Sequence, residues 1–166
     1  SSFAVVLAAK WLLIGRYVPR AAPMWTPFVW LSEAVTNLYE SIAVPNFVNF
    51  LRGTPFLPWV FNLLGCRIGP GVVMDTTDIT EYDCVEIGAG SVLNAWSGPQ
   101  THLFEDRVMK MSYVTLEENC SVGGMSVVLY DSKMEKNAIL DPLSVLMKNE
   151  TLSADNRYIG APANKI

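Results

Sequence analysis

The sequence predicts a mainly β solenoid built from triangular coils, preceded by an α-helical region. The first observation is an apolar residue at every sixth position from 116 to 146. The second is a small residue two places before each following apolar one. A fixed period with fixed residue classes is typical of solenoids. The apolar positions are Leu116, Val122, Val128, Met134, Leu140 and Leu146, and the small positions are Cys120, Ser126, Ser132, Ala138 and Ser144.

A period of six matches neither the 3.6 period of an α-helix nor the period of 2 of a single strand. It suits a triangular coil with one short strand on each side, because the large apolar residue then points inward and the small one fits where the wall is tight. Successive coils stack at the strand spacing of about 4.8 Å. This pattern, with the C-terminal segment 160–165, resembles the hexapeptide-repeat family, whose fold is the left-handed parallel β-helix and which includes many acyltransferases.

The amino-acid composition restricts what the chain is expected to bind. The chain has 166 residues, of which 51 % are hydrophobic and 17 % charged, and its net charge is −4. A negative net charge argues against nucleic acid as a partner. Cys66, Cys84 and Cys120 form no disulfide framework, and with a single histidine they do not supply a zinc site. We therefore expect no bound metal.

Residues 1–65 form the predicted helical region. The apolar run from Phe3 to Ile14 is broken by Lys10 and is shorter than the roughly 20 residues needed to span a bilayer. Lys10, Arg16 and Trp11 are typical of the cytoplasmic flank of a membrane helix. The alternative is a helix packed on the protein. The absence of an initial Met leads us to expect a piece of a longer protein.

Further helices are expected between residues 27 and 64. Pro27 favours the first turn of a helix that ends before Pro45, and Thr54-Pro55 opens another that ends at Gly65. This last helix has little polar surface, so it is expected to be buried against the first coils or to lie in a membrane interface.

Residues 66–166 form the predicted β-helix, and the repeat of six residues is irregular in its first coils. Ile68 and Ile87 begin readable repeats, but Glu81 occupies a position that is usually apolar, so we expect this coil to be irregular or exposed. The acidic group formed by Asp75, Asp78, Glu81 and Asp83 is interpreted as a solvated coil edge, with a metal site as the less favoured alternative.

An insertion interrupts the count of six. The interval from Leu93 to Leu116 is not a multiple of six, and Gly98-Pro99 breaks the strand pattern. We therefore predict an inserted loop at about residues 96–111. Residues that leave a regular solenoid lie on its surface, where functional groups collect.

This insertion contains the candidate catalytic residue, His102, the only histidine in the chain. A neutral imidazole is the usual base for an amine or hydroxyl near pH 7, which is what acyl transfer requires. Glu105 and Asp106 are close enough in sequence to orient the ring. The predicted substrate-binding residues are Asn94, Gln100 and Thr101. The alternative is an idle, solvated histidine.

Longer motifs narrow the resemblance. Segments 100–110, 53–55, 63–65 and 143–148 are similar to the C-terminal region of membrane-bound nonribosomal-peptide-synthetase-like proteins of the ε-poly-lysine synthetase group. The resemblance implies an aminoacyl thioester on the phosphopantetheine arm of a carrier domain as acyl donor, with carrier and adenylation domains in the same polypeptide. It also implies neighbouring β-helix modules or a homotrimer, a site shared between modules, and membrane association with the active region facing the cytoplasm.

Two other functions fit the same pattern. One is a catalytically inactive β-helix that acts as a scaffold in a tandem array, and the other is an acetyltransferase that uses coenzyme A. Asp131, Asn137 and Asn149 stand where many members of the group carry glycine, which bears on whether this copy is active.

Overall fold

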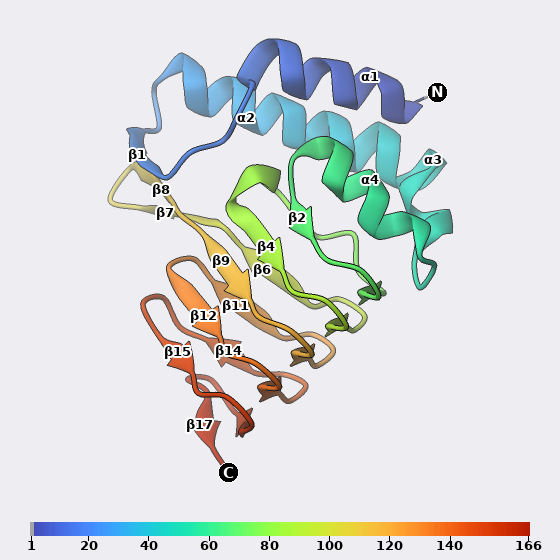
Figure 1. The fold of residues 1–166 in the computed structure, drawn as a ribbon. Coiled ribbons are helices and arrows are strands. Elements are labelled where there is room, and N and C mark those ends of the chain that lie inside the picture. Colours follow the sequence, from blue (N-terminus) through green and yellow to red (C-terminus); the bar gives the residue numbers. More distant parts are fainter. Residues whose placement is uncertain (1) are drawn as a thin grey trace.

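N-terminal helices lie across one end of a stack of β-coils in this computed structural model, which describes residues 2–166 (Figure 1). The helical segments are α1 (Ser2–Ala9), η1 (Lys10–Ile14), α2 (Pro27–Leu38), η2 (Tyr39–Ala43), α3 (Val44–Asn46), η3 (Val48–Leu51) and α4 (Phe56–Leu64), followed within the coils by η4 (Tyr82–Cys84).

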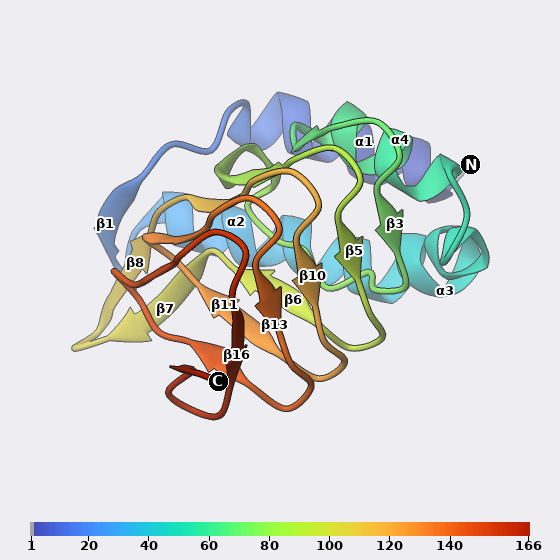
Figure 2. The same ribbon diagram turned by 60° about the horizontal axis from the view of Figure 1, so that its bottom comes forward.

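Three parallel sheets form the walls of the β-helix, and Figure 2 shows the strands of the second wall side by side. The first wall contains β2 (Arg67–Ile68), β4 (Val85–Ile87), β9 (Val114–Leu116), β12 (Ser132–Met134) and β15 (Thr151–Leu152). The second contains β3 (Val73–Met74), β5 (Val92–Leu93), β10 (Ser121–Val122), β13 (Ile139–Leu140) and β16 (Arg157–Ile159), with β17 (Asn164–Lys165) antiparallel to β16. The third contains β6 (Gly98–Gln100), β11 (Val127–Leu129) and β14 (Val145–Leu146).

The repeat of six is confirmed as the spacing of the walls. Ser121 pairs with Ile139, and Ile139 pairs with Arg157, so one coil consists of three repeats of six. Ser126 and Ser144, in equivalent places of consecutive coils, are accordingly 18 residues apart. All six predicted inward residues are at most 1 % exposed, and the five small residues are at most 4 % exposed. The apolar side chains therefore fill the coil, and the small ones allow its backbone to turn at the corners.

The corners of the coils have a left-handed backbone. Positions 119, 125, 131, 137, 143, 149 and 155 recur at every sixth place, and each has φ between 55° and 63°. Asn and Asp adopt this conformation more readily than other residues with a side chain, and they fill five of the seven corners. The absence of glycine at Asp131, Asn137 and Asn149 is thus compatible with a regular coil.

The first coil is irregular, as the irregular repeat in its sequence predicted. Arg67 pairs with Glu86, so this coil is one position longer than a regular coil of three repeats of six. Between β3 and β4 the chain forms η4 in place of a strand. The expectation that Glu81 is exposed is wrong: its side chain is completely buried. Glu81 also has φ 27°, so its backbone departs from the extended form there.

The insertion is a β-hairpin. Ser91 and Cys120 occupy equivalent places in consecutive coils, yet they are 29 residues apart, so this coil exceeds three repeats of six. The hairpin consists of β7 (His102–Glu105) and β8 (Val108–Met111), and β1 (Arg20–Pro23) extends it to a three-stranded antiparallel sheet. The sequence placed the loop at about residues 96–111, but residues 98–100 belong to the third wall, because β6 pairs with β11.

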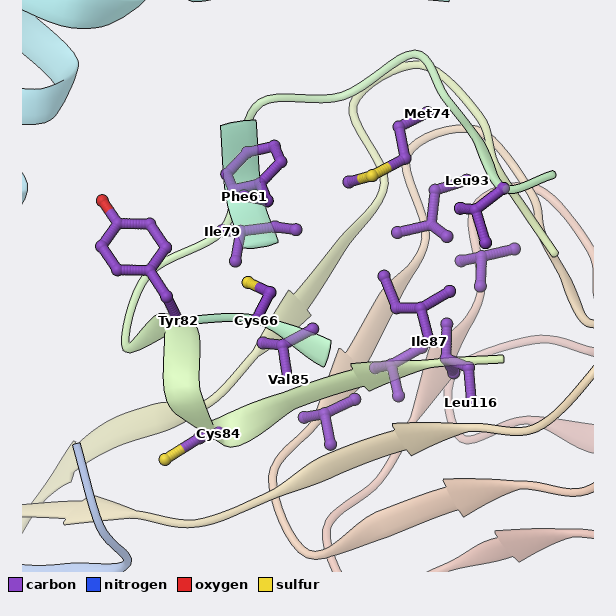
Figure 3. Close-up of a cluster of buried hydrophobic side chains, with 14 of the residues drawn as sticks. Phe61, Cys66, Met74, Ile79, Tyr82, Cys84, Val85, Ile87, Leu93 and Leu116 are labelled. Carbon is purple, nitrogen blue, oxygen red and sulfur yellow. The ribbon is translucent and has the colours of Figure 1, made fainter. Parts of the chain in front are cut away.

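The helices and the coils share one hydrophobic core. Phe61 of α4 lies beside Ile79 and the inward residues of the first coils (Figure 3). Tyr39 and Phe61 also contact Tyr82 of η4, with ring centroids 5.8 and 6.3 Å away. The helical layer therefore closes the open end of the solenoid.

A buried ion pair joins the first helices to this junction. Lys10 Nζ lies 2.7 Å from Asp83 Oδ2, and the Lys10 side chain is completely buried. The Lys10 side chain therefore lies inside the protein, and Asp83, with Glu81, does not form a solvated coil edge. Asp83 also accepts a hydrogen bond from the backbone N–H of Tyr17 at 3.0 Å. In the described part of the chain, no helix combines the length and the apolarity needed to cross a membrane.

The corner at Leu143 offers a test of the coil geometry. Leu143 is 71 % exposed and has φ 58°, so it gains little from burial while its backbone is strained. We expect Leu143→Asn to raise the free energy of unfolding by about 0.5–1 kcal/mol, since asparagine tolerates the left-handed region. Urea unfolding measures the change. Asn149→Leu, at an equivalent exposed corner, should lower it, and effects of the same sign for both variants would contradict the geometry.

Candidate acid–base site

His102 and Glu81 meet where the hairpin leaves the β-helix. His102 Nδ1 lies 2.7 Å from Glu81 Oε2, and only 12 % of the His102 side chain is exposed. The two residues are distant in sequence and come together because the first coil brings its irregular segment under the start of β7. The ring packs edge-on against Phe104, with centroids 5.3 Å apart.

Two threonines hold the carboxylate of Glu81 in place. Thr101 Oγ1 donates to Glu81 Oε2 at 2.5 Å, and Thr80 Oγ1 donates to the same oxygen at 2.8 Å. The other oxygen, Oε1, is buried and accepts no hydrogen bond within residues 2–166. The left-handed backbone at Glu81 costs on the order of 1–3 kcal/mol, and such strain concentrates at functional sites. Glu81 thus combines strain, burial and an unsatisfied acceptor.

The pKa of His102 is raised above its ordinary value of 6.5. Burial has the largest single effect and lowers the pKa, since it disfavours the charged ring. The hydrogen bond to Glu81, the negative charge of Glu81 and the charge of Glu33 act in the opposite direction and together prevail. A bond at Nδ1 also leaves Nε2 as the nitrogen that can exchange a proton with a substrate.

Glu105 and Asp106 do not orient the imidazole, contrary to the sequence prediction. Successive side chains of a strand point to opposite faces, so Glu105 lies on the face of β7 away from His102. Its carboxylate pairs with Lys148 at 2.6 Å and Lys110 at 3.0 Å, which lowers its pKa to about 2. Asp106 lies in the exposed hairpin turn with φ 52°. Glu105 therefore anchors the hairpin through its ion pairs, and Asp106 forms part of the hairpin turn.

The predicted substrate-binding residues are divided between two places. Thr101 is buried beside Glu81, and Gln100 Nε2 donates to the backbone oxygen of His102 at 3.2 Å. Asn94 is exposed and donates to the backbone oxygen of Val122 at 2.8 Å. It lines a depression of about 560 Å³ on the outer face of the β-helix, together with Asp141 and Arg157. The structure therefore groups Thr101 and Gln100 with His102 and places Asn94 apart.

Glu81 is a candidate site residue that the sequence did not identify. The signal was present, because a carboxylate stood at a coil position that is usually apolar. A charged residue at such a position is stable only when it is paired or hydrogen-bonded. The partner could not be identified from the sequence, since it follows much later in the chain, in an insertion of unknown path.

A cavity of about 350 Å³ adjoins the pair where the helical layer meets the first coil. Its lining includes Thr80, which donates to Glu81, and the carboxylates of Glu40 and Asp78. Tyr39 and Trp96 provide aromatic surface in the same cavity. Burial raises the pKa of Asp78. The cavity is also lined by Arg52, so it combines carboxylates, a guanidinium and aromatic surface, and Thr80 links it to Glu81.

Other groups in the chain are less suited to chemistry. Burial raises the pKa of the Cys84 thiol to about 12 and that of Cys120 to about 11, so neither is a thiolate near neutral pH. No cluster of three or more potential metal ligands occurs among the described residues. His102 and Glu81 thus form the one histidine–carboxylate pair within residues 2–166.

Comparisons with known proteins identify the fold class first. The chain is a parallel β-helix of the hexapeptide-repeat type. A hexapeptide-repeat-containing acetyltransferase from Vibrio cholerae superimposes with a TM-score of 0.51 at 14 % identity, covering 62 % of each chain. A serine O-acetyltransferase from Brucella melitensis superimposes with a TM-score of 0.51 at 10 % identity, covering 99 % of this chain and 66 % of the other. These similarities establish the fold.

A protein of similar sequence gives a more specific assignment than the structural superpositions. The chain is 55 % identical over 161 residues to the delta-poly-L-ornithine synthetase of Acinetobacter baumannii (strain AB307-0294). The match covers 97 % of this chain and 12 % of that protein, so the chain spans about an eighth of its relative. No protein-family model matches the sequence. The chain is therefore homologous to a segment of a poly-amino-acid synthetase, which confirms the resemblance to synthetases of this kind.

The His102–Glu81 pair predicts a pH dependence of stability. Because the pKa of His102 is raised by folding, its charge stabilises the folded state below about pH 6.5, and this contribution is lost as the pH rises through the folded-state pKa. Glu81→Gln removes the charge that raises the pKa, so the pKa should fall below its ordinary value. NMR titration of the ring measures it. Asp106→Asn is the control, and an unchanged pKa in Glu81→Gln would refute the pairing.

Proposed function

We propose that this chain forms amide bonds by transferring an aminoacyl group from a thioester to the amine of a diamino acid or of a growing chain. The buried pair of His102 and Glu81 is the observation that carries the proposal. The similarity to a delta-poly-L-ornithine synthetase supports an amine acceptor, and the fold is one on which acyl transfer is common. His102 acts as general base and Glu81 as its positioning residue.

The path of each proton follows from the chemistry of the amine acceptor. An amine that arrives as an ammonium ion loses one proton to solvent before it attacks. The nitrogen then attacks the thioester carbonyl, and His102 Nε2 takes the second proton. Collapse of the tetrahedral intermediate breaks the carbon–sulfur bond, and the imidazolium returns its proton to the thiolate. The products are an amide and a free thiol.

Glu81 suits the reaction because His102 becomes positively charged during it. The carboxylate is buried and fixed by Thr80 and Thr101, so little reorganisation is needed when the charge develops. Its bond to Nδ1 holds the tautomer that leaves Nε2 as the base. The same carboxylate raises the pKa of the ring, so that a protonated His102 is stable enough to act as the acid in the second half of the reaction.

The donor in this proposal is an aminoacyl thioester on the phosphopantetheine arm of a carrier domain. The carrier and adenylation domains belong to the same polypeptide, and a neighbouring β-helix module or a second copy of the chain completes the site. The position of His102 supports this arrangement, because it lies at the base of a hairpin that extends beyond the wall. An arm that follows the wall then reaches the ring at the hairpin's base.

Replacement of His102 tests the catalytic assignment. In the full-length protein, His102→Ala should reduce polymer formation about 10²- to 10⁴-fold, since a general base is lost, while loading of the carrier stays normal. Asp106→Asn, in the hairpin turn, should retain activity. Normal output from His102→Ala would instead support the scaffold alternative. Transfer from free acetyl-coenzyme A with normal rate would support the acetyltransferase alternative.

We further propose that the helical layer rests on the cytoplasmic surface of a membrane. Leu12 and Leu13 of η1 are 84 % and 52 % exposed, and Trp59 and Leu63 of α4 are 66 % and 56 % exposed. The Trp11 indole donates to the backbone oxygen of Leu63 at 3.0 Å, which makes these residues one apolar face. Tryptophan and leucine on an outward helical face favour a membrane interface.

Flotation with lipid vesicles tests this face. The chain should float with vesicles that contain anionic lipids, and the double variant Leu12→Glu/Trp59→Glu should remain in the soluble fraction, because each charge would have to enter the apolar interface. Leu143→Asn removes an exposed leucine at a coil corner, so this control should float as the wild type does. Equal flotation of all three proteins, or no flotation of the wild type, would overturn the proposal.

A further inference from the structure

Glu33 of α2 lies across from His102. Val29 and Met109 belong to one buried cluster, which places the first turns of α2 on β8. Glu33 follows Val29 by four positions and therefore lies on the same side of the helix, one turn farther on. In the hairpin, Phe104 pairs with Met109 and His102 with Met111, so His102 is the next residue on that face. The face of α2 that begins at Val29 thus brings Glu33 toward His102.

Electrostatics agree with this placement. The charge of Glu33 contributes to the raised pKa of His102. Burial is the largest cause of the raised pKa of Glu33, and repulsion from Glu81 and Glu40 adds to it, while His102 acts in the opposite direction. Within the part of the chain that the structure describes, the Glu33 carboxylate forms no hydrogen bond or ion pair, although it is half-buried.

The cations around the site are engaged elsewhere. Lys10 pairs with Asp83, Arg52 pairs with Asp75, and the Arg20 guanidinium lies 4.1 Å above the ring of Phe28. Lys110 and Lys148 pair with Glu105 on the opposite face of the hairpin. When His102 is neutral, no Lys or Arg among residues 2–166 forms an ion pair with Glu33 or Glu81. Oε1 of Glu81 is also a buried acceptor without a donor.

We propose that Glu33 is a substrate-binding residue that holds the ammonium group of a cationic amine acceptor next to His102. This inference rests on the proposed function and names the part of the site that selects the acceptor. A primary ammonium has three N–H donors and one positive charge, which suit the half-buried carboxylate of Glu33, a carboxylate without partners. The cavity of about 350 Å³ that begins at Thr80 is lined by Glu40, Asp78, Arg52 and Trp96 and offers room for the rest of a diamino acid.

In this proposal Glu33 binds the amine acceptor and not the acyl donor. A carboxylate near the thioester would disfavour the oxyanion that develops on its carbonyl, so the acyl donor is expected on the side of His102 away from α2. The acceptor then enters between α2 and the hairpin and is held at Glu33 as an ammonium ion. After it loses one proton to solvent, its nitrogen attacks the thioester beside His102 Nε2, which takes the second proton. This order explains why an acid without a partner is kept beside a base.

The experiment compares a cationic with an uncharged acceptor in the full-length protein. Carrier-bound aminoacyl thioester is offered to L-ornithine or to hydroxylamine, which is uncharged at neutral pH, and amide or hydroxamate formation is measured. Glu33→Gln should raise the KM for ornithine roughly 10- to 100-fold, the range expected for one hydrogen bond to a charged group. Its rate with hydroxylamine should remain within about twofold of the wild type. Glu33→Asp should recover part of the affinity for ornithine, and Glu118→Gln, at an exposed carboxylate on the outer wall, is the control.

His102→Ala separates the failure of this inference from the failure of the proposed function. If His102→Ala reduces the rate with both acceptors but Glu33→Gln changes neither the KM for ornithine nor the selectivity, the base is correct and the ammonium site is wrong. If His102→Ala leaves both rates unchanged, the proposed function itself fails. An equal loss with both acceptors in Glu33→Gln would show that Glu33 supports the fold of the site, and would also overturn the inference. Circular dichroism of each variant verifies folding.

Discussion

The closure of each coil after three repeats of six is the constraint on which the structure depends. A strand in this fold is only two to four residues long, so it is stable only when its backbone groups pair with the coils above and below. Such pairing requires that every coil return to the same register. The apolar residue at each sixth position then reaches the centre, and the corner adopts a left-handed backbone. A change in coil length anywhere must therefore be absorbed by an excursion from the wall.

The candidate functional groups lie where that rule is broken. The coil that contains Glu81 is one position longer than the regular coils, and the next coil is lengthened by the hairpin that begins at His102. Departures from local rules in a regular fold are expected at functional sites, since they lower stability and persist only when they contribute something else. Here two consecutive departures place a base and its carboxylate 2.7 Å apart.

The helical layer has a structural and an electrostatic role. The first coil leaves an open end, and α4 covers it with Leu57, Phe61 and Leu64, all completely buried. The same junction contains the buried ion pair Lys10–Asp83. Removal of one partner from such a pair leaves an uncompensated charge and costs about 3–5 kcal/mol, whereas the intact pair contributes little net stability. The Lys10–Asp83 pair therefore orients η1 on the coils more than it holds η1 there.

The sequence by itself determined the solenoid, because the side-chain classes at each sixth position state which residues point inward. It also located the insertion and the only histidine, since the count of six fails between Leu93 and Leu116. The tertiary structure alone decided which acid serves His102. Glu105 is close to it in sequence but points to the other side of its strand, while Glu81 is far from it in sequence and lies against the ring. Proximity along a chain does not determine proximity in space when strand alternation and coil closure place the side chains.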